Sequence, residues 1–178
     1  WAADLEAGPR EKLTAAAKVD PFREKFTFHV PGFNVRGTEI AAHIGLSQLK
    51  RADAVAEARK ANDRVYRALF QEQKGFSIQH PAPGTTAVAS IGFGVCASSQ
   101  AHRTKVAAAL AAKGIDTRPI GGGNMGRQPF WQAAYGKPKR ERPVADMIND
   151  RGFQLPNHPG LMPEDIAYIS DTVLAVQP

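Results

Sequence analysis

The sequence predicts an α/β chain with a single hydrophobic core. A long amphipathic helical pattern covers residues 50–74, a strand-helix-strand pattern occupies 87–120, and an apolar-periodic helix follows Pro163. The chain has 178 residues, and 43% of them are hydrophobic. This length is enough for one domain with a real core and too short for two large domains.

The first part of the chain, residues 1–36, is predicted to be an irregular arm and interface segment. Trp1 to Phe28 is charged and alanine-rich, and Pro9 and Pro21 bound the one short helical stretch. FTFHV, residues 26–30, alternates like a short strand or an extended approach to the next segment.

Residues 37–74 are predicted to be connecting helices. Thr38 is the expected N-cap, and the apolar residues that follow are separated by small ones, which indicates a helix buried on most of its surface. A bend is expected between Lys50 and Asp53. The second helix has an apolar stripe of Ala52, Val55, Ala56, Val65, Leu69 and Phe70.

Residues 75–178 are predicted to be a small C-terminal α/β domain. Its strand pattern over 87–98 contains Gly92 and Gly94, which indicate close backbone approach. The helix after it is capped by Ser98 or Ser99 and ends at Gly114. The remaining elements are an extended 115–120, a helix over 144–150, an extended FQLP at 153–156 and the helix after Pro163.

The amino-acid composition argues against several classes of partner and site. The net charge of +6 is dispersed, and the dense basic run at 137–142 has no interleaved aromatic residues, so nucleic acid is not an expected partner. No apolar run is long enough to span a membrane. The single Cys96 excludes an internal disulfide and a cysteine-based zinc site. A cytoplasmic protein without a metal site is the simplest expectation.

Two stretches carry residue types suited to an anionic ligand. Asn34 and Arg36 precede the helix that begins near Thr38, so an amide, a cation and free backbone N–H groups gather at one place. An Asx-turn at Asn34 and a surface ion pair at Arg36 are the alternative interpretation.

The second stretch is TRPIGGGNMGRQPFW, residues 117–131. Arg118 and Arg127 flank a glycine-rich loop that contains Asn124, an arrangement suited to a phosphate or diphosphate. Phe130 or Trp131 offers a face to a base or a sugar. The alternative is a flexible connector before a helix that begins near Gln128.

The first stretch resembles a known family. GFNVRGTEIAAHIGLSQL matches the pattern G-[YF]-N-x-R-x-[ST]-[DE]-x-x-A-x-x-G-x-x-Q-L of the DegT-type (StrS-like) sugar aminotransferases. The second stretch resembles the segment ETR-x-x-x-x-G-N-x-x-R-x-P of the subgroup that includes nucleotide-linked 4-keto-6-deoxyhexose 3-dehydratases. QLPNHPGL, which contains His158, is similar to a further segment of the family near its C-terminus.

The resemblance implies the C-terminal portion of an aspartate-aminotransferase-like (PLP-dependent transferase) fold, with helices packed on a small, mostly antiparallel sheet. It implies pyridoxal 5'-phosphate as cofactor and a nucleotide-linked keto-deoxy sugar as substrate, with 3-dehydratase favoured over aminotransferase. Asn34, and less strongly Arg36, would bind the cofactor phosphate. Arg118, Asn124, Arg127 and His158 would line the substrate entrance.

The resemblance covers only the part that follows the cofactor lysine in the family. Lys12, Lys18 and Lys50 lie in no similar context, so no catalytic residue is assigned and the chain alone is expected to be inactive. A chain that starts at Trp1 is expected to be a piece of a longer product. The expected partner is a second copy or a missing N-terminal domain. A non-catalytic nucleotide-sugar-binding or partner-subunit module is the alternative.

Overall fold

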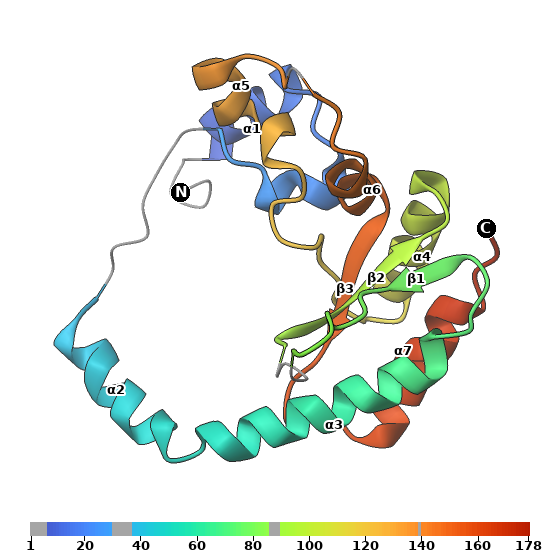
Figure 1. Cartoon of the computed structure of the whole chain (residues 1–178). Coiled ribbons are helices and arrows are strands. Elements are labelled where there is room, and N and C mark those ends of the chain that lie inside the picture. Colours follow the sequence, from blue (N-terminus) through green and yellow to red (C-terminus); the bar gives the residue numbers. More distant parts are fainter. Residues whose placement is uncertain (1–6, 30–36, 86–89, 139) are drawn as a thin grey trace.

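The computed structural model describes residues 7–29, 37–85, 90–138 and 140–178, which form a small sheet surrounded by helices (Figure 1). The elements are α1 (Ala7–Ala16), the 3-10 helix η2 (Pro21–Phe26), α2 (Glu39–Leu49), α3 (Ala52–Phe70), β1 (Phe76–Ile78), β2 (Gly92–Ala97), α4 (Gln100–Ala112), the 3-10 helix η3 (Met125–Arg127), α5 (Pro129–Tyr135), α6 (Pro143–Arg151), β3 (Gly152–Pro156) and α7 (Pro163–Leu174).

The sheet has the strand order β1-β2-β3, and both strand pairs are antiparallel. In the central pairing, Phe93 lies opposite Leu155 and Val95 lies opposite Phe153. The antiparallel sheet predicted from the family resemblance is therefore confirmed. The predicted extended segment 115–120 pairs with the sheet only through the isolated bridge between Arg118 and Gln154.

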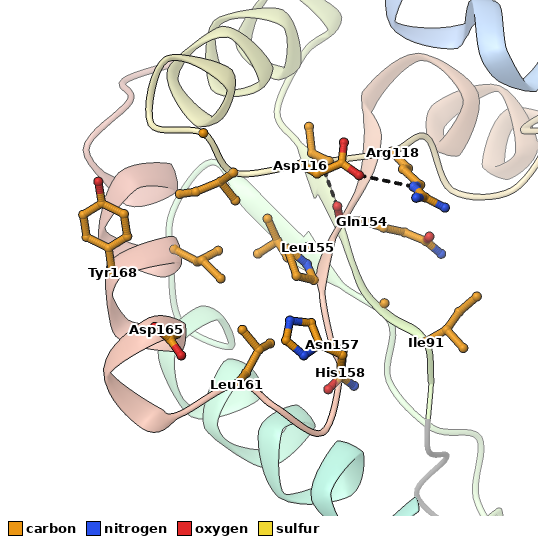
Figure 2. Close-up of a pocket in the computed structure, with 16 residues that line it drawn as sticks. Ile91, Asp116, Arg118, Gln154, Leu155, Asn157, His158, Leu161, Asp165 and Tyr168 are labelled. Carbon is orange, nitrogen blue, oxygen red and sulfur yellow. Dashed lines mark hydrogen bonds and ion pairs between the residues drawn. The ribbon is translucent and has the colours of Figure 1, made fainter. Parts of the chain in front are cut away.

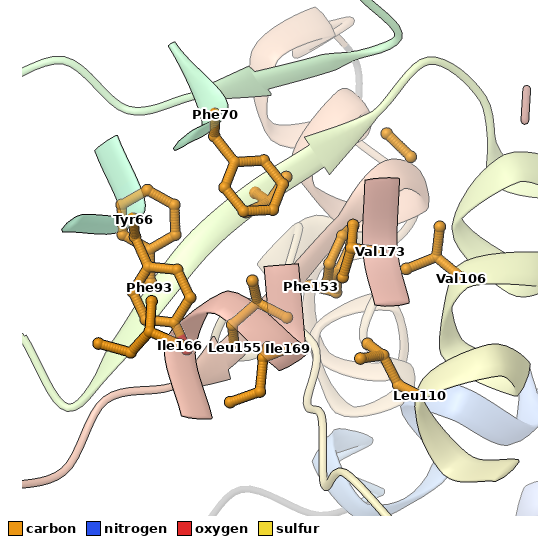
Figure 3. Close-up of a cluster of buried hydrophobic side chains, with 12 residues drawn as sticks. Tyr66, Phe70, Phe93, Val106, Leu110, Phe153, Leu155, Ile166, Ile169 and Val173 are labelled. Atoms are coloured by element: carbon orange, nitrogen blue, oxygen red, sulfur yellow. The ribbon is translucent and has the colours of Figure 1, made fainter. Parts of the chain in front are cut away.

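One face of the sheet carries the hydrophobic core (Figure 3). Alternate residues of β2 and β3 point to this face because side chains along a strand alternate in direction. Helices α3, α4 and α7 cover it, and the stacked rings of Tyr66 and Phe93 have centroids 4.9 Å apart. The buried members of the core are Tyr66, Phe70, Phe93, Val95, Ala97, Val106, Leu110, Phe153, Leu155, Ile166, Ile169 and Val173.

The opposite face carries glycines where other groups approach the backbone. A Cβ at Gly92 would lie 3.2 Å from the side chain of Gln154, and one at Gly94 would lie 3.4 Å from Cδ1 of Ile120. These distances support the prediction that both glycines mark close backbone approach. The segment before the glycine-rich loop therefore lies directly on the sheet.

Several predicted helix ends are confirmed by their hydrogen bonds. The hydroxyl of Thr38 accepts from the N–H of Ala41 at 3.1 Å, and the hydroxyl of Ser99 accepts from the N–H of His102 at 3.0 Å. Gly114 follows α4 with φ +70°, the left-handed conformation expected after a helix. The predicted bend is also present, since α2 ends at Leu49 and α3 begins at Ala52.

The N-terminal arm is more regular than its composition predicts. Helices α1 and η2 occupy much of its described part. No strand forms over the described residues 26–29, and Thr27 is extended, as in the alternative prediction of an extended approach. Asp20 accepts from the N–H of Phe22 and starts the 3-10 turn, and the hydroxyl of Thr27 donates to Arg23 O at 3.0 Å. These local side-chain bonds favour a helical turn over an extended chain.

Burial differs from the prediction in both connecting helices. Every residue of α2 is exposed, so the prediction of a buried helix is wrong for the described structure, in which α2 lies away from the sheet (Figure 1). In α3, the buried residues are Asn62, Asp63, Tyr66 and Phe70, whereas Val65 is exposed. Only the second half of α3 reaches the sheet, so its first half has no core to face.

Candidate functional site

An open cleft of about 680 Å³ lies beside β3 (Figure 2). One wall is the segment after α4, and the other is the loop after β3 together with α7. A volume of this size is typical of small-molecule sites. The lining residues are Ile91, Gly92, Gly114, Ile115, Asp116, Thr117, Arg118, Gln154, Leu155, Pro156, Asn157, His158, Leu161, Asp165, Tyr168 and Ile169.

Arg118 lies on the wall formed by residues 114–118. Its backbone is fixed by the bridge to β3, in which the N–H of Gln154 donates to Arg118 O at 2.6 Å. The hydroxyl of Thr117 also donates to Gln154 O, at 2.8 Å. The Arg118 guanidinium is exposed and lies 3.5 Å from Asp116, a loose ion pair that leaves donors for a ligand.

His158 lies on the other wall, in a rigid loop. The neighbouring Asn157 is 1% exposed and donates to Ser90 O at 2.9 Å, while Asn62 donates to His158 O at 3.0 Å. The N–H of Gly160 donates to His158 Nδ1 at 3.2 Å. Because a backbone N–H can only donate, a neutral His158 carries its proton on Nε2, which makes that nitrogen a hydrogen-bond donor.

Two residues of α7 that line the cleft, Asp165 and Tyr168, were not predicted as site residues from the sequence. Asp165 accepts from the N–H of Met162 at 2.9 Å with one carboxylate oxygen, and Tyr168 is exposed along the same helix. Figure 2 shows both beside the cleft. The only signal in the sequence was a pair of polar residues three apart, each directly before a buried position, Ile166 and Ile169.

Beside the cleft, the edge of β3 has no free backbone groups at Pro156 with which a further strand could pair. Pro156 has no N–H, and its carbonyl already accepts from the hydroxyl of Tyr66 at 2.9 Å. Burial, together with the nearby Asp165 carboxylate, raises the pKa of the Tyr66 phenol, so the hydroxyl stays protonated and donates. The cleft is therefore suited to a small ligand and not to an added peptide strand.

The other two predicted substrate residues, Asn124 and Arg127, do not line this cleft. Asn124 is 5% exposed, and it donates to Asp146 at 2.9 Å and accepts from the N–H of Gly126 at 3.0 Å. Arg127 donates to both carboxylate oxygens of Asp150, at 2.8 and 2.9 Å. The hydrogen bond to Asp150 outweighs the effect of burial and raises the pKa of Arg127. The charge of Arg127 is thus balanced within the chain.

The space over the glycines is occupied by the N-terminal arm. The buried Arg23 donates to Gly122 O at 2.7 Å and to Asn149 O at 2.9 Å, and its burial lowers its pKa. Gln128 accepts from the N–H of Phe28 at 2.9 Å and donates to Gly122 O at 2.7 Å. Neither residue was predicted from the sequence, because their partners lie about a hundred positions away.

A second cleft, of about 430 Å³, lies between η2 and the segment that carries Arg118. Asp116, Thr117 and Arg118 line both clefts, so one short segment forms the wall between them. The other lining residues are Pro21, Phe22, Glu24, Lys25, Phe26 and Pro119.

Asn34 and Arg36, the predicted cofactor residues, lie outside the described residues. Every described lysine is exposed except Lys60, which is half-buried and is paired with Glu57 at 2.7 Å. A lysine that binds pyridoxal phosphate covalently needs a desolvated amine. The described residues of this chain therefore do not fit a complete pyridoxal phosphate site.

The same residues contain neither a metal site nor a membrane-spanning helix. In the described ranges, no three His, Cys, Asp or Glu residues lie close enough to hold a metal ion. No helix among the elements above combines the length and the apolar character needed to cross a bilayer.

The sequence profile of the DegT/DnrJ/EryC1/StrS aminotransferase family matches residues 11–174. The chain belongs to this family. It is 33% identical over 113 residues to a GDP-4-keto-6-deoxy-D-mannose 3-dehydratase of Yersinia pseudotuberculosis, which covers 64% of this chain and 28% of the relative. It is 30% identical over 174 residues to a GDP-perosamine synthase of Caulobacter vibrioides, covering 92% and 43%.

The fold is also that of solved family structures. The Escherichia coli GDP-4-keto-6-deoxy-D-mannose-3-dehydratase with bound hydrated PLP aligns with a TM-score of 0.68 and 24% identity, over 86% of this chain and 40% of that structure. A sugar aminotransferase of Streptococcus pneumoniae aligns with a TM-score of 0.70 and 21% identity, over 83% and 37%. The chain thus has part of the PLP-dependent aminotransferase fold and spans less than half the length of these relatives.

Proposed function

We propose that this chain is the substrate-side, C-terminal part of a pyridoxal-phosphate-dependent enzyme that modifies nucleotide-linked keto-deoxy sugars. The observation that carries the proposal is the cleft beside β3, which Arg118 and His158 line from two separate segments. The sequence predicts both as substrate residues. A guanidinium and an imidazole that donates from Nε2 are suited to the phosphates of a nucleotide-sugar.

The proposal also gives a role to each of the other site residues predicted from the sequence. Asn34 and Arg36 would bind the phosphate of pyridoxal 5'-phosphate, in a site completed by a second copy or by an N-terminal domain. Asn124 and Arg127 would contribute to the substrate side through the loop that they stabilise. The free, buried Cys96 supports a reducing compartment such as the cytoplasm.

Within the family, we propose 3-dehydration over transamination. The loop around Asn124 resembles the dehydratase segment, and several similar proteins carry the name 3-dehydratase. GDP-perosamine synthases are also among the relatives, which keeps transamination as the competing reaction.

Calorimetric titration of the chain with GDP tests the cleft. We expect binding that weakens about tenfold in Arg118→Ala and in His158→Ala, because each variant loses a hydrogen bond to a charged group. Arg64→Ala removes an exposed arginine of α3 that does not line the cleft and should bind as the unmodified chain does. No binding, or equal binding by all variants, would overturn this site.

A non-catalytic nucleotide-sugar-binding module is the second candidate function. The absence of a buried lysine among the described residues favours it for the isolated chain. A chain that binds GDP and, after incubation with pyridoxal phosphate and desalting, shows no visible absorbance band would support the module. A retained band would support the enzyme.

A further inference from the structure

Helix α5 carries an exposed aromatic pair that belongs to neither cleft. No residue of α5 is buried, and Trp131 and Tyr135 are 38% and 72% exposed. The two residues are four positions apart, so they lie on the same side of the helix, and their ring centroids are 4.7 Å apart. None of residues 129–142 lines the cleft beside β3 or the cleft beside η2. The surface is therefore separate from the proposed nucleotide-sugar site.

Other residues of α5 attach the helix to the rest of the chain. Gln132 donates to Gly126 O at 3.3 Å, and the N–H of Phe130 donates to Phe28 O at 3.3 Å. The indole N–H of Trp131 and the hydroxyl of Tyr135 have no hydrogen-bond partner among the residues that the structure describes. Figure 1 shows α5 beside α1, on the side of the molecule away from α3. The aromatic pair is thus held outward with its polar groups available.

The segment after α5 adds positive charge to this surface. Residues 137–142 contain four lysines and arginines and one glutamate, a net charge of +3. Lys137, Arg140 and Arg142 are exposed, and within the described ranges none of them forms an ion pair. The nearby Arg127, by contrast, is paired with Asp150 at 2.8 Å. Cations that the chain itself does not balance attract an anionic partner.

We propose that α5, together with Lys137, Arg140 and Arg142, binds the surface of a membrane that contains anionic lipids. Tryptophan and tyrosine combine an apolar ring with a polar group, and both are enriched where a membrane meets water. Lysines and arginines beside them are attracted to anionic head groups. Binding of this kind is peripheral, with apolar side chains in the head-group region, and it needs no membrane-spanning helix.

The geometry of the aromatic pair favours a lipid surface over single-stranded nucleic acid. Bases stack on open aromatic faces. The rings of Trp131 and Tyr135 instead pack on each other with an interplanar angle of 48°, so each ring covers part of the other. A lipid surface also needs no pocket, and neither of the two clefts extends to these residues.

The test measures binding of the full chain to vesicles made of equal parts of phosphatidylglycerol and phosphatidylcholine. The chain has two tryptophans, so Trp1→Phe leaves Trp131 as the only one. We expect co-sedimentation with these vesicles and a blue shift of the Trp131 emission. Both should be absent with vesicles of phosphatidylcholine alone, and both should be lost in about 1 M salt, where the Debye length is about 3 Å.

Lys137→Ala combined with Arg140→Ala should weaken vesicle binding about 25-fold, since each cation near an anionic surface contributes about fivefold. Tyr135→Ala should weaken it about fivefold through the loss of buried apolar area. The matched control combines Arg64→Ala with Lys74→Ala, which removes two exposed cations from outside this surface. It should bind vesicles as the unmodified chain does.

Equal weakening of the two double variants would mean that only net charge acts and would overturn the proposal. So would the absence of vesicle binding, or binding without a blue shift. Binding of a single-stranded thymidine oligonucleotide in place of vesicles would overturn it in favour of nucleic acid. None of the substituted residues lines a cleft, so calorimetric titration with GDP should give the same affinity for every variant. Failure here therefore leaves the proposed function untouched.

Discussion

At the scale of single residues, the glycine-rich loop is explained by contacts within the chain. A Cβ at Gly123 would collide with Nη2 of Arg23 and would lie 2.5 Å from Oδ1 of Asn149. A Cβ at Gly122 would lie 3.3 Å from the ring of Phe28. The loop is therefore rich in glycine because the N-terminal arm packs on it.

Gly123→Ala should lower the free energy of unfolding by about 3 kcal/mol or more, because it combines a left-handed φ of +68° with the collision against Arg23. Gly121→Ala is the matched control, since its φ is +52° and nothing lies within 4 Å of the added Cβ. We expect the control to cost about 1 kcal/mol. Urea unfolding measures both, and equal losses would refute the packing explanation.

Gln128→Met should cost about 2–3 kcal/mol in the same measurement. The substitution keeps the length of the side chain but removes the acceptor of the Phe28 N–H and the donor to the carbonyls of Phe26 and Gly122, of which Gly122 O keeps its bond from Arg23. Gln132→Met removes one long bond of 3.3 Å to Gly126 O and should cost less than about 1 kcal/mol. Similar costs for the two variants would mean that Gln128 does not hold the arm.

Asp150 should make the stability depend on pH in the acid range. Burial alone would raise the pKa of its carboxyl group, but the hydrogen bonds from Arg127 and Asn149 outweigh burial and lower the pKa. A folded-state pKa below the unfolded one gives stabilisation that is complete above the unfolded value and is lost as the pH falls through the folded value.

The free energy of unfolding should accordingly decrease between roughly pH 5 and pH 3, and the decrease should be shallower in Asp150→Asn. Asp171→Asn changes an exposed carboxyl group of α7 and serves as control. Identical pH profiles for the unmodified chain and Asp150→Asn would contradict the assignment.

At the scale of elements, α2 is an apolar helix whose residues are all exposed. Ile40, Leu46 and Leu49 are 75%, 67% and 70% exposed, and the helix is apolar on several sides. Such helices are normally buried in larger assemblies. In the described structure, α2 instead contributes exposed apolar surface, which promotes aggregation.

Ile44→Lys should therefore change the free energy of unfolding by less than about 0.5 kcal/mol. Light scattering of concentrated solutions should fall, because an apolar exposed residue becomes charged. Ile169→Ala, in the core side of α7, should by contrast cost about 2–4 kcal/mol. A large loss of stability in Ile44→Lys would show that α2 packs against another part of the chain.

At the scale of the whole molecule, the exposure of the described lysines predicts how they react with pyridoxal phosphate. All described lysines are exposed or half-buried, so none has the desolvated amine that binds pyridoxal phosphate selectively. We expect incubation with pyridoxal phosphate, followed by borohydride reduction and peptide mass spectrometry, to show low and scattered modification. One stoichiometric modified lysine would contradict this expectation.

Much of the fold was predictable from local pattern. The caps at Thr38 and Ser99, the break between α2 and α3, and the apolar periodicity of α7 all depend on residues within a few positions of one another. Of the four predicted substrate residues, Arg118 and His158 do share a cleft. Asn124 and Arg127 instead bond to α6, because the carboxylates that balance them come from residues 146 and 150.

The sequence by itself determined the family, the helix boundaries and the residue types that suit a phosphate ligand, since these depend on short-range spacing. Only the tertiary structure decided which of those residues line a common cleft. Arg23 and Gln128 join segments about a hundred positions apart, and Arg118 lies on the wall between two clefts. Such long-range contacts depend on how the sheet and the helices pack on one another. The spacing of neighbouring residues in the sequence does not predict that packing.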